Sequence, residues 1–239
     1  MPQALFNSMT TITLNLQAVR DRIARAALAS GRSAREVSLL AVSKTTPRSC
    51  IEEACLSGQH AFGESYVQEG VRKITQLAHL GIEWHFIGPI QSNKTRLIAE
   101  HFQWVHSVDR DKIAARLNDA RPRHLPPLDV CIQVNVSGEK NKSGVAPGEA
   151  RELARVIKKL DRLRLRGLMT IPEATSDISL QRRRYALLRT LKDELNGAGY
   201  ALDTLSMGMS DDLESAIAEG ATIVRVGTAI FGSRETLQT

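Results

Sequence analysis

The sequence is poor in aromatic residues, in cysteine and in long apolar runs, and each shortage excludes a class of protein. Phe, Trp and Tyr make up 4% of the 239 residues, which leaves few rings on which nucleic-acid bases could stack. The three cysteines and six histidines have no metal-site or redox spacing. No apolar run approaches the roughly 20 residues of a membrane span, and residues 1–8 do not begin a signal peptide. We therefore expect a soluble, cytoplasmic protein without membrane contact, whose cysteines are free thiols.

Short apolar runs alternate with helical patterns along the rest of the chain. A leading helix is expected at about residues 11–30, where apolar residues recur at helical spacing. About eight strand–helix units follow without a long linker, and residues 128–136 form the clearest strand. The Gly-x-Gly-x-x-Gly fingerprint of a dinucleotide fold is absent. This pattern predicts one α/β domain over residues 1–239, a (β/α)8 TIM-type barrel with an extra helix at its N-terminus.

The first predicted strand, residues 37–44, ends in Lys44, and Thr45, Thr46 and Pro47 follow it. Barrel enzymes place their reactive groups at the carboxyl ends of the strands. Partial desolvation lowers the pKa of an amine, so a lysine in such a place can attack a carbonyl. A lysine at the end of a strand more often only extends to solvent. The run by itself leaves both interpretations open.

A possible anion site follows the seventh predicted strand. Gly208 and Ser210 precede a predicted helix, and Asp211 and Glu214 have the spacing of a capping box. Unpaired amides at a helix start can bind an anion. An efficient helix cap without any ligand explains the same residues.

A second possible anion site follows the eighth strand, where Arg225 is succeeded by Gly227 and Thr228. The loops after strands seven and eight often form a phosphate site in barrels. A buried guanidinium is costly without a partner, and the predicted strands contain few acids, so a ligand atom is a candidate acceptor. An amine, a phosphate cradle and a buried arginine would together suit pyridoxal 5′-phosphate (PLP), an aldehyde with a phosphate and a ring nitrogen.

Seven longer motifs, spread over nearly the whole chain, resemble those of the pyridoxal phosphate homeostasis protein family. They are Val42-Ser-Lys-Thr45, Phe62-Gly-Glu64, Trp84-His-Phe-Ile-Gly-Pro-Ile-Gln-Ser-Asn-Lys-Thr95, Val134-Asn-Val-Ser-Gly138, Gly167-Leu-Met-Thr-Ile-Pro172, Leu205-Ser-Met-Gly-Met-Ser-Asp211 and Val226-Gly-Thr-Ala-Ile-Phe-Gly232. The resemblance implies a barrel similar to the N-terminal domain of bacterial alanine racemase. This is PLP fold type III without its C-terminal β-domain.

The same resemblance implies roles for single residues. Lys44 would form the Schiff base with PLP, and Arg225 would face the pyridine nitrogen. The phosphate would be held by Ser210, Gly227 and Thr228. His85 and Asn135 would lie on strand ends around the ring.

The chain departs from the family pattern at two positions near Lys44. Ser65 stands where relatives usually have asparagine, which could remove a contact near the cofactor. Thr46 stands where relatives often have lysine, so a second amine that assists cofactor exchange is in doubt.

Arg225 also bears on catalysis, because an arginine keeps its proton and would leave the ring nitrogen unprotonated. That weakens the ring as an electron sink. The racemase relatives take a second base, a tyrosine, from a further domain across a dimer interface, whereas here only residues 233–239 follow the last barrel element. Of Tyr66, Tyr185 and Tyr200, only Tyr66 is expected near the mouth. We therefore expect a monomer that stores, buffers or delivers PLP, possible recipients being PLP-dependent apo-enzymes, without being an enzyme itself. A PLP-dependent amino-acid racemase is the alternative.

Two further functions remain as weaker hypotheses. A sugar-phosphate barrel enzyme would use the phosphate cradle but leave Arg225 unexplained. A nucleic-acid binder would use the basic residues between Arg151 and Arg166 and the run Arg182–Arg184, although such charges usually lie on solvated helix faces and we expect no nucleic acid. The loop 137–144 is either a lid with a phosphate contact through Lys142 or a plain surface loop.

Overall fold

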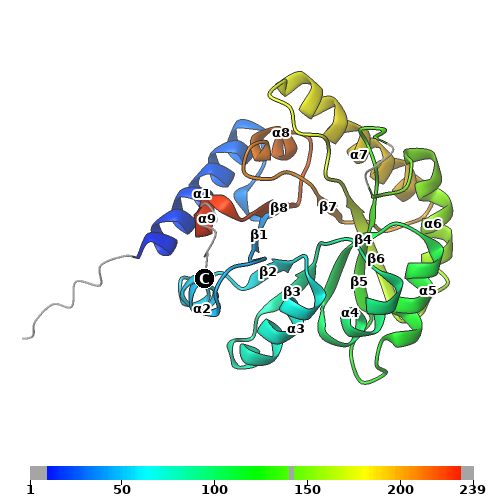
Figure 1. Ribbon diagram of the computed structural model, residues 1–239. Helices are drawn as coiled ribbons and strands as arrows, with labels where there is room; N and C mark the ends of the chain where they lie inside the picture. Colours follow the sequence, from blue (N-terminus) through cyan, green and yellow to red (C-terminus); the bar gives the residue numbers. More distant parts are fainter. Residues whose placement is uncertain (1–9, 140–142, 233–239) are drawn as a thin grey trace, which may run out of the picture.

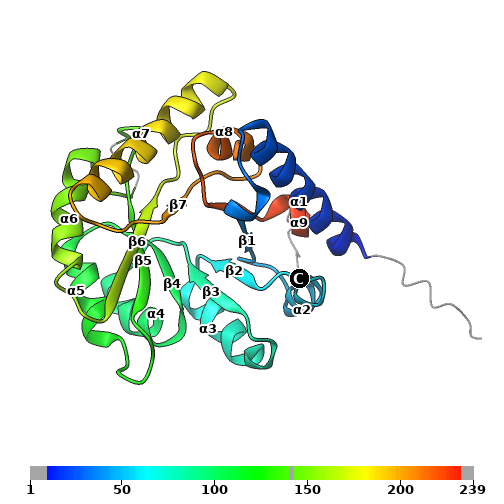
Figure 2. The same cartoon turned by 180° about the vertical axis from the view of Figure 1, so that it is seen from behind.

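Eight parallel strands close into a barrel in the computed structural model, which describes residues 10–139 and 143–232. Each strand pairs with its neighbours in chain order, and β8 returns to β1, so that Leu40 lies opposite Arg225. Figures 1 and 2 show the helices arranged as an outer ring around these strands. The predicted (β/α)8 barrel is confirmed.

The strands are short, and their bounds agree with the predicted apolar runs to within a few residues. They are β1 (Ser38–Val42), β2 (Ala61–Glu64), β3 (Glu83–Phe86), β4 (Trp104–Val108), β5 (Leu128–Gln133), β6 (Leu163–Met169), β7 (Thr204–Ser206) and β8 (Ile223–Val226). The largest difference is in β5, which was expected to reach residue 136. It ends at Gln133: the Val134 amide still donates to the Met169 carbonyl at 2.8 Å, but Val134 itself bridges Val145 of the following loop.

The helices follow the strands in the expected order. They are α1 (Thr11–Ala29), α2 (Arg48–Leu56), α3 (Val67–Gln76), α4 (Thr95–His101), α5 (Asp111–Ala120), α6 (Ala150–Ile157), α7 (Ile178–Gly197), α8 (Leu213–Ala218) and α9 (Thr228–Phe231). The described residues also contain the 3₁₀ turns η1 (Ala34–Glu36), η2 (Ala78–Leu80), η3 (Ser92–Lys94) and η4 (Pro147–Glu149). Among the helices of the described ranges, none combines the length and apolarity that a membrane crossing requires.

The leading helix α1 covers the seam where the barrel closes. Its buried stripe includes Leu16, Val19 and Ile23, as the helical spacing predicts. Figure 1 shows α1 beside α8 and α9, the last two helices of the chain. Asn15 donates its side-chain amide to the Ile230 carbonyl at 2.9 Å. The extra helix therefore holds the end of the barrel against its beginning.

Candidate functional site

Lys44 lies in a tight turn directly after β1, at the carboxyl end of the strands. The Thr46 amide donates to the Ser43 carbonyl at 3.0 Å, which closes the turn around Lys44 and Thr45. Thr45 has a φ of 60°, a left-handed conformation in which a β-branched residue is strained. Lys44 itself is half-buried. The lysine is thus presented at the barrel mouth by a turn that needs support from its surroundings.

That support is a cluster of charged side chains between β2 and α3, formed by Lys73, Glu64 and Glu69 and called here the Lys73 cluster. Lys73 is 6% exposed. Its Nζ donates to the Ser43 carbonyl at 2.6 Å, to Glu64 Oε1 at 2.8 Å and to Glu69 Oε1 at 2.6 Å. Glu69 Oε1 also accepts the Thr45 amide at 2.7 Å. The cluster therefore binds the backbone on both sides of Lys44.

Glu64 is the most deeply buried member of the Lys73 cluster, with no exposed surface. Its Oε1 accepts the Ser43 hydroxyl at 2.6 Å, while Oε2 has no partner among the described residues. Burial raises the pKa of Glu64, although the Lys73 ammonium opposes this shift. A Cβ on Gly70 would stand 2.7 Å from the Phe102 ring and 3.3 Å from Glu64 Cβ. The glycine thus allows α3 to approach the carboxylate closely.

The three residues expected to hold a phosphate lie after β7 and β8, as predicted. Ser210 is half-buried in the segment before α8, and Gly227 and Thr228 form the turn into α9. Within the described ranges, their amides donate to no other backbone group. Gly227 lies close to β1, since a Cβ there would be 3.1 Å from the Val42 carbonyl oxygen. The turn at Gly227 therefore lies beside the end of β1, from which the Lys44 turn follows.

The predicted capping box of Asp211 and Glu214 is wrong. Helix α8 begins at Leu213, so Asp212 takes the N-cap position, and its Oδ1 accepts the Met209 amide at 2.6 Å. Glu214 pairs instead with Arg22 of α1 at 2.8 Å. The acid that organises this turn stands one position later than the spacing indicated.

Tyr185 also reaches this turn, which the sequence did not indicate. It is fully buried on α7, and its hydroxyl donates to Asp212 Oδ2 at 2.6 Å. Burial, followed by the nearby Asp212 charge, raises the pKa of Tyr185. By contrast, Tyr66 at the start of α3 is 56% exposed. The expectation that only Tyr66 comes near the mouth was incomplete.

Arg225 is a buried cation at the carboxyl end of the barrel, with 3% of its surface exposed. Its Nη1 donates to the Ser206 hydroxyl and its Nη2 to the Thr170 carbonyl, both at 2.8 Å. No carboxylate of the described chain forms a hydrogen bond or ion pair with it. Burial lowers the pKa of Arg225, yet an arginine remains charged. The protein thus surrounds this guanidinium with neutral acceptors.

Two residues that the resemblance assigns to the ring have different surroundings. His85 lies within β3, and its Nε2 is 2.8 Å from Glu83 Oε1 while its Nδ1 is 2.9 Å from His106 Nε2. It is thus inside the barrel and not at a strand end, because β3 continues through Phe86. Asn135 does follow β5, where it accepts the Gly138 amide at 3.0 Å and donates to the Glu139 carbonyl at 2.7 Å. Its side chain holds a turn of the loop.

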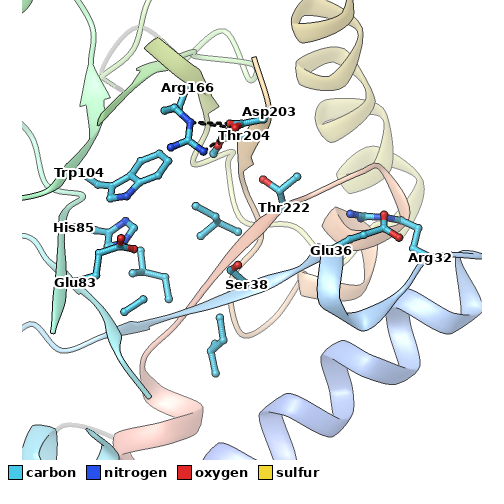
Figure 3. Close-up of a pocket in the computed structure, with 14 residues that line it drawn as sticks. Arg32, Glu36, Ser38, Glu83, His85, Trp104, Arg166, Asp203, Thr204 and Thr222 are labelled. Carbon is cyan, nitrogen blue, oxygen red and sulfur yellow. Dashed lines mark hydrogen bonds and ion pairs between the residues drawn. The ribbon is translucent and has the colours of Figure 1, made fainter. Parts of the chain in front are cut away.

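A cavity of about 450 Å³ opens at the opposite, amino-terminal end of the barrel. Figure 3 shows Glu83, His85 and Trp104 on one side of it, and Arg32 and Glu36 on the other. The Trp104 ring is stacked against the His85 ring at a centroid distance of 5.3 Å. The Arg166 guanidinium carbon lies 4.7 Å from the centroid of the Trp104 ring. This cavity is far from the Lys44 turn, since it is lined by residues at the strand starts.

Within the described residues, five of the ten basic residues considered for nucleic-acid binding form ion pairs with carboxylates. Arg155 pairs with Glu152, Arg164 and Arg166 with Asp129, Arg182 with Glu219, and Arg184 with Glu173. Such pairing weakens the field that would attract a phosphate backbone. Lys142, the proposed phosphate contact of the loop 137–144, is outside the described residues.

Among the residues that the structure describes, no group of three His, Cys, Asp or Glu side chains could hold a metal ion. Cys50, Cys55 and Cys131 are free, as expected.

Comparison with known proteins identifies the family. Residues 14–235 match the model of the alanine racemase N-terminal domain. The pyridoxal phosphate homeostasis protein of Pseudomonas aeruginosa is 59% identical, over 95% of this chain and 97% of its own length, and that of Escherichia coli K12 is 54% identical, over 95% and 98%. The structure of PipY from Synechococcus elongatus with PLP bound superposes with a TM-score of 0.81 at 35% identity, covering 92% of this chain and all of that one. The chain therefore belongs to the pyridoxal phosphate homeostasis protein family, whose barrel is that of the alanine racemase N-terminal domain.

Proposed function

We propose that this protein binds PLP and takes part in its homeostasis, storing, buffering or delivering it. The observation that carries the proposal is Arg225, a buried cation at the barrel mouth whose hydrogen-bond acceptors among the described residues are neutral. Two of its five N–H groups are used by Ser206 and Thr170. The other three donate to no described residue, and a pyridine nitrogen would be a suitable acceptor for one of them. The PLP-bound PipY relative supports the same ligand.

The residues proposed for the site are of the kinds that PLP requires. PLP supplies an aldehyde that condenses reversibly with a primary amine, and Lys44 is the amine that the turn after β1 presents. The amides of Ser210, Gly227 and Thr228, with two hydroxyls, would receive the phosphate. Arg225 would donate to the ring nitrogen and hold it unprotonated. Each of these assignments is a proposal from the local geometry and the family.

The hydrogen bonds and contacts of Tyr185 and Tyr200 favour PLP binding without catalytic turnover. A racemase needs two bases that flank the substrate carbon. Tyr185, the tyrosine buried near the mouth, donates its proton to Asp212, and its raised pKa disfavours loss of that proton. Tyr200 is engaged beneath Lys158, whose Nζ lies 4.9 Å from its ring centroid. We propose a carrier and not an enzyme.

The proposal extends to the domain organisation, the oligomeric state, the cellular location and the recipients of the cofactor. We infer that residues 1–239 form one domain and act as a monomer in the cytoplasm, where the three free thiols would remain reduced. PLP-dependent apo-enzymes would be the recipients of the cofactor.

An absorption spectrum of the purified protein tests the proposal. We expect PLP to produce a visible band, and borohydride to trap it on the peptide that contains Lys44. The variant Lys44→Ala should lose both signals, while Lys112→Ala, which removes an exposed lysine of α5, should keep them. A colourless protein, or trapping on other lysines alone, would contradict PLP binding at this site. Turnover of amino-acid enantiomers that depends on Lys44 would favour the racemase.

A further inference from the structure

A continuous chain of hydrogen bonds crosses the interior of the barrel. It runs from Glu83 to His85, His106, Ser206 and Arg225, and is called here the barrel relay. The successive distances are 2.8 Å from Glu83 Oε1 to His85 Nε2, 2.9 Å from His85 Nδ1 to His106 Nε2, 2.8 Å from His106 Nδ1 to Ser206 Oγ, and 2.8 Å from Ser206 Oγ to Arg225 Nη1. The relay therefore connects the amino-terminal cavity with the cation at the mouth.

The two ends of the barrel relay differ in kind, and this difference determines where its protons lie. Arg225 can only donate hydrogen bonds, and an ionised Glu83 can only accept them. The hydrogen bond with His85 lowers the pKa of Glu83, so the carboxylate is ionised at neutral pH. Every group between these ends must therefore accept from the Arg225 side and donate toward Glu83.

Both histidines are neutral, which makes this order unique. Burial lowers the pKa of His85. The pKa of His106 is lowered further, first by burial and then by the repulsion that a protonated His85 and Arg225 exert on a second cation. A neutral imidazole has one donor and one acceptor nitrogen. Because Glu83 needs a donor, His85 carries its proton on Nε2 and accepts on Nδ1. His106 then carries its proton on Nε2 as well, and its Nδ1 accepts the Ser206 hydroxyl.

The consequence for Arg225 is that the Ser206 oxygen turns its lone pairs toward the guanidinium. In the reverse order, His106 would donate to Ser206, and the serine oxygen would be shared between two donors. The proton order thus decides how well the protein solvates and orients a buried cation that has no hydrogen-bonded carboxylate within the described residues.

We propose that Glu83 is a positioning residue, whose carboxylate sets the proton order of the barrel relay and thereby aims the Ser206 oxygen at Arg225 from the far end of the barrel. Its bearing on cofactor affinity rests on the proposed function, in which Arg225 faces the ring of PLP. In the barrel relay, Glu83 is separated from Arg225 by His85, His106 and Ser206.

The cavity provides a matched control for Glu83. Glu36 lines the same cavity, and the side chains of Glu83 and Glu36 are each 53% exposed. Glu36 pairs with Arg32 and is not part of the relay. A lysine at either position makes the same change in charge, but only Glu83→Lys replaces the acceptor of the relay with a donor. Glu83→Gln keeps a carbonyl acceptor and should preserve the order.

The experiment measures ¹⁵N chemical shifts of the histidine rings in protein without PLP, assigned with single-histidine substitutions, and then the PLP dissociation constant by titration. We expect the Nε2–H tautomer for His85 and His106 in the wild type, in Glu83→Gln and in Glu36→Lys. Glu83→Lys should shift both rings toward the Nδ1–H tautomer. The same variant should bind PLP about tenfold more weakly, while Glu83→Gln and Glu36→Lys stay within about twofold of the wild type.

Three results would show that Glu83 does not set the proton order. They are an Nδ1–H tautomer in the wild type, unchanged tautomers in Glu83→Lys, or a tautomer shift in Glu36→Lys equal to that in Glu83→Lys. Reversed tautomers with undiminished PLP affinity would overturn the positioning of Arg225 by the relay. A wild-type protein that takes up no PLP would contradict the proposed function alone, because the ring shifts still decide whether Glu83 sets the proton order.

Discussion

The Lys73 cluster and the barrel relay are both buried and polar, and they work by different physics. The Lys73 cluster lies outside the sheet, and its charges bind the backbone of the turn around Lys44. The barrel relay lies inside, and between its charged ends it contains only neutral groups that orient the side chain of Arg225. Charges hold a strained loop in place strongly but leave a large penalty when one is removed. A neutral chain is weaker, and it can transmit an orientation over the depth of the barrel.

The first prediction breaks the charged cluster. Lys73→Met keeps much of the side-chain volume but leaves Glu64 and Glu69 without their cation. Removing one member of a buried ion pair costs about 3–5 kcal/mol, so we expect a loss of this size in the free energy of unfolding, measured by urea denaturation. The turn around Lys44 should also become accessible to hydrogen exchange.

A second substitution tests whether the loss comes from the stranded charge. In Lys73→Met combined with Glu64→Gln, part of the stability should return, because the deepest carboxylate is neutral. If the double variant is as unstable as the sum of the two single variants, the cluster is not coupled as the structure indicates.

The second prediction breaks the neutral relay at its hydroxyl. Ser206→Ala leaves Arg225 Nη1 and His106 Nδ1 without a partner, which should cost about 1–3 kcal/mol of unfolding free energy. PLP affinity should fall as well. Ser107→Ala is the control, since this buried serine donates its hydroxyl to the Gly88 carbonyl. The Ser107→Ala variant should lose less stability than Ser206→Ala and no more than a small part of the PLP affinity. Equal losses of affinity in the two variants would contradict a special role for Ser206.

The third prediction uses pH to charge the relay. The folded protein holds the pKa of His106 well below its ordinary value of 6.5, so the unfolded chain binds a proton first on acidification. Stability from this residue is therefore present above pH 6.5 and declines below it, by about 1.4 kcal/mol per pH unit. We expect the unfolding free energy of His106→Asn to depend less steeply on pH between 6.5 and 5.5 than that of the wild type. Identical slopes, or an NMR titration of His106 near pH 6.5, would show that it is not held neutral.

The fourth prediction concerns the strain that the Lys73 cluster maintains. Thr45→Asn places a residue that tolerates positive φ at this position, so we expect the protein to gain up to about 1 kcal/mol of unfolding free energy. Thr46→Asn, in the same turn without the positive φ, should gain nothing. A loss of stability in Thr45→Asn greater than that in Thr46→Asn would mean that the Thr45 side chain contributes more than its backbone strain costs.

Much of the fold was predictable because it depends on local patterns. The β-branched runs give the eight strands, and the stripe of Leu16, Val19 and Ile23 gives α1. Lys44, Ser210 and Gly227 could be placed because a parallel barrel brings the ends of all its strands to one face. The helix cap was predicted at Asp211 but lies at Asp212, because the spacing of two adjacent acids does not show which of them the local backbone turn places at the start of the helix.

The two polar networks were not predicted, although each leaves a trace in the sequence. Lys73 lies three residues after Gly70 and six after Val67, so all three lie on the buried stripe of α3. Glu83 and His85 share a face of β3, because they are two residues apart. Such spacing places a polar group in the interior but does not identify its partner, which comes from another strand or helix far along the chain.

The position of the proposed site at the seam between β1 and β8 has a consequence for folding. Lys44 follows β1 and Thr228 follows β8, and these two strands can pair only after β8 has been made. Contacts between such distant residues form late in folding, because they require the ordering of everything between them. A growing chain that lacks β8 would have neither Arg225 nor the final turn. Uptake of the cofactor would then act as a sign of completed synthesis, available only to barrels that have closed.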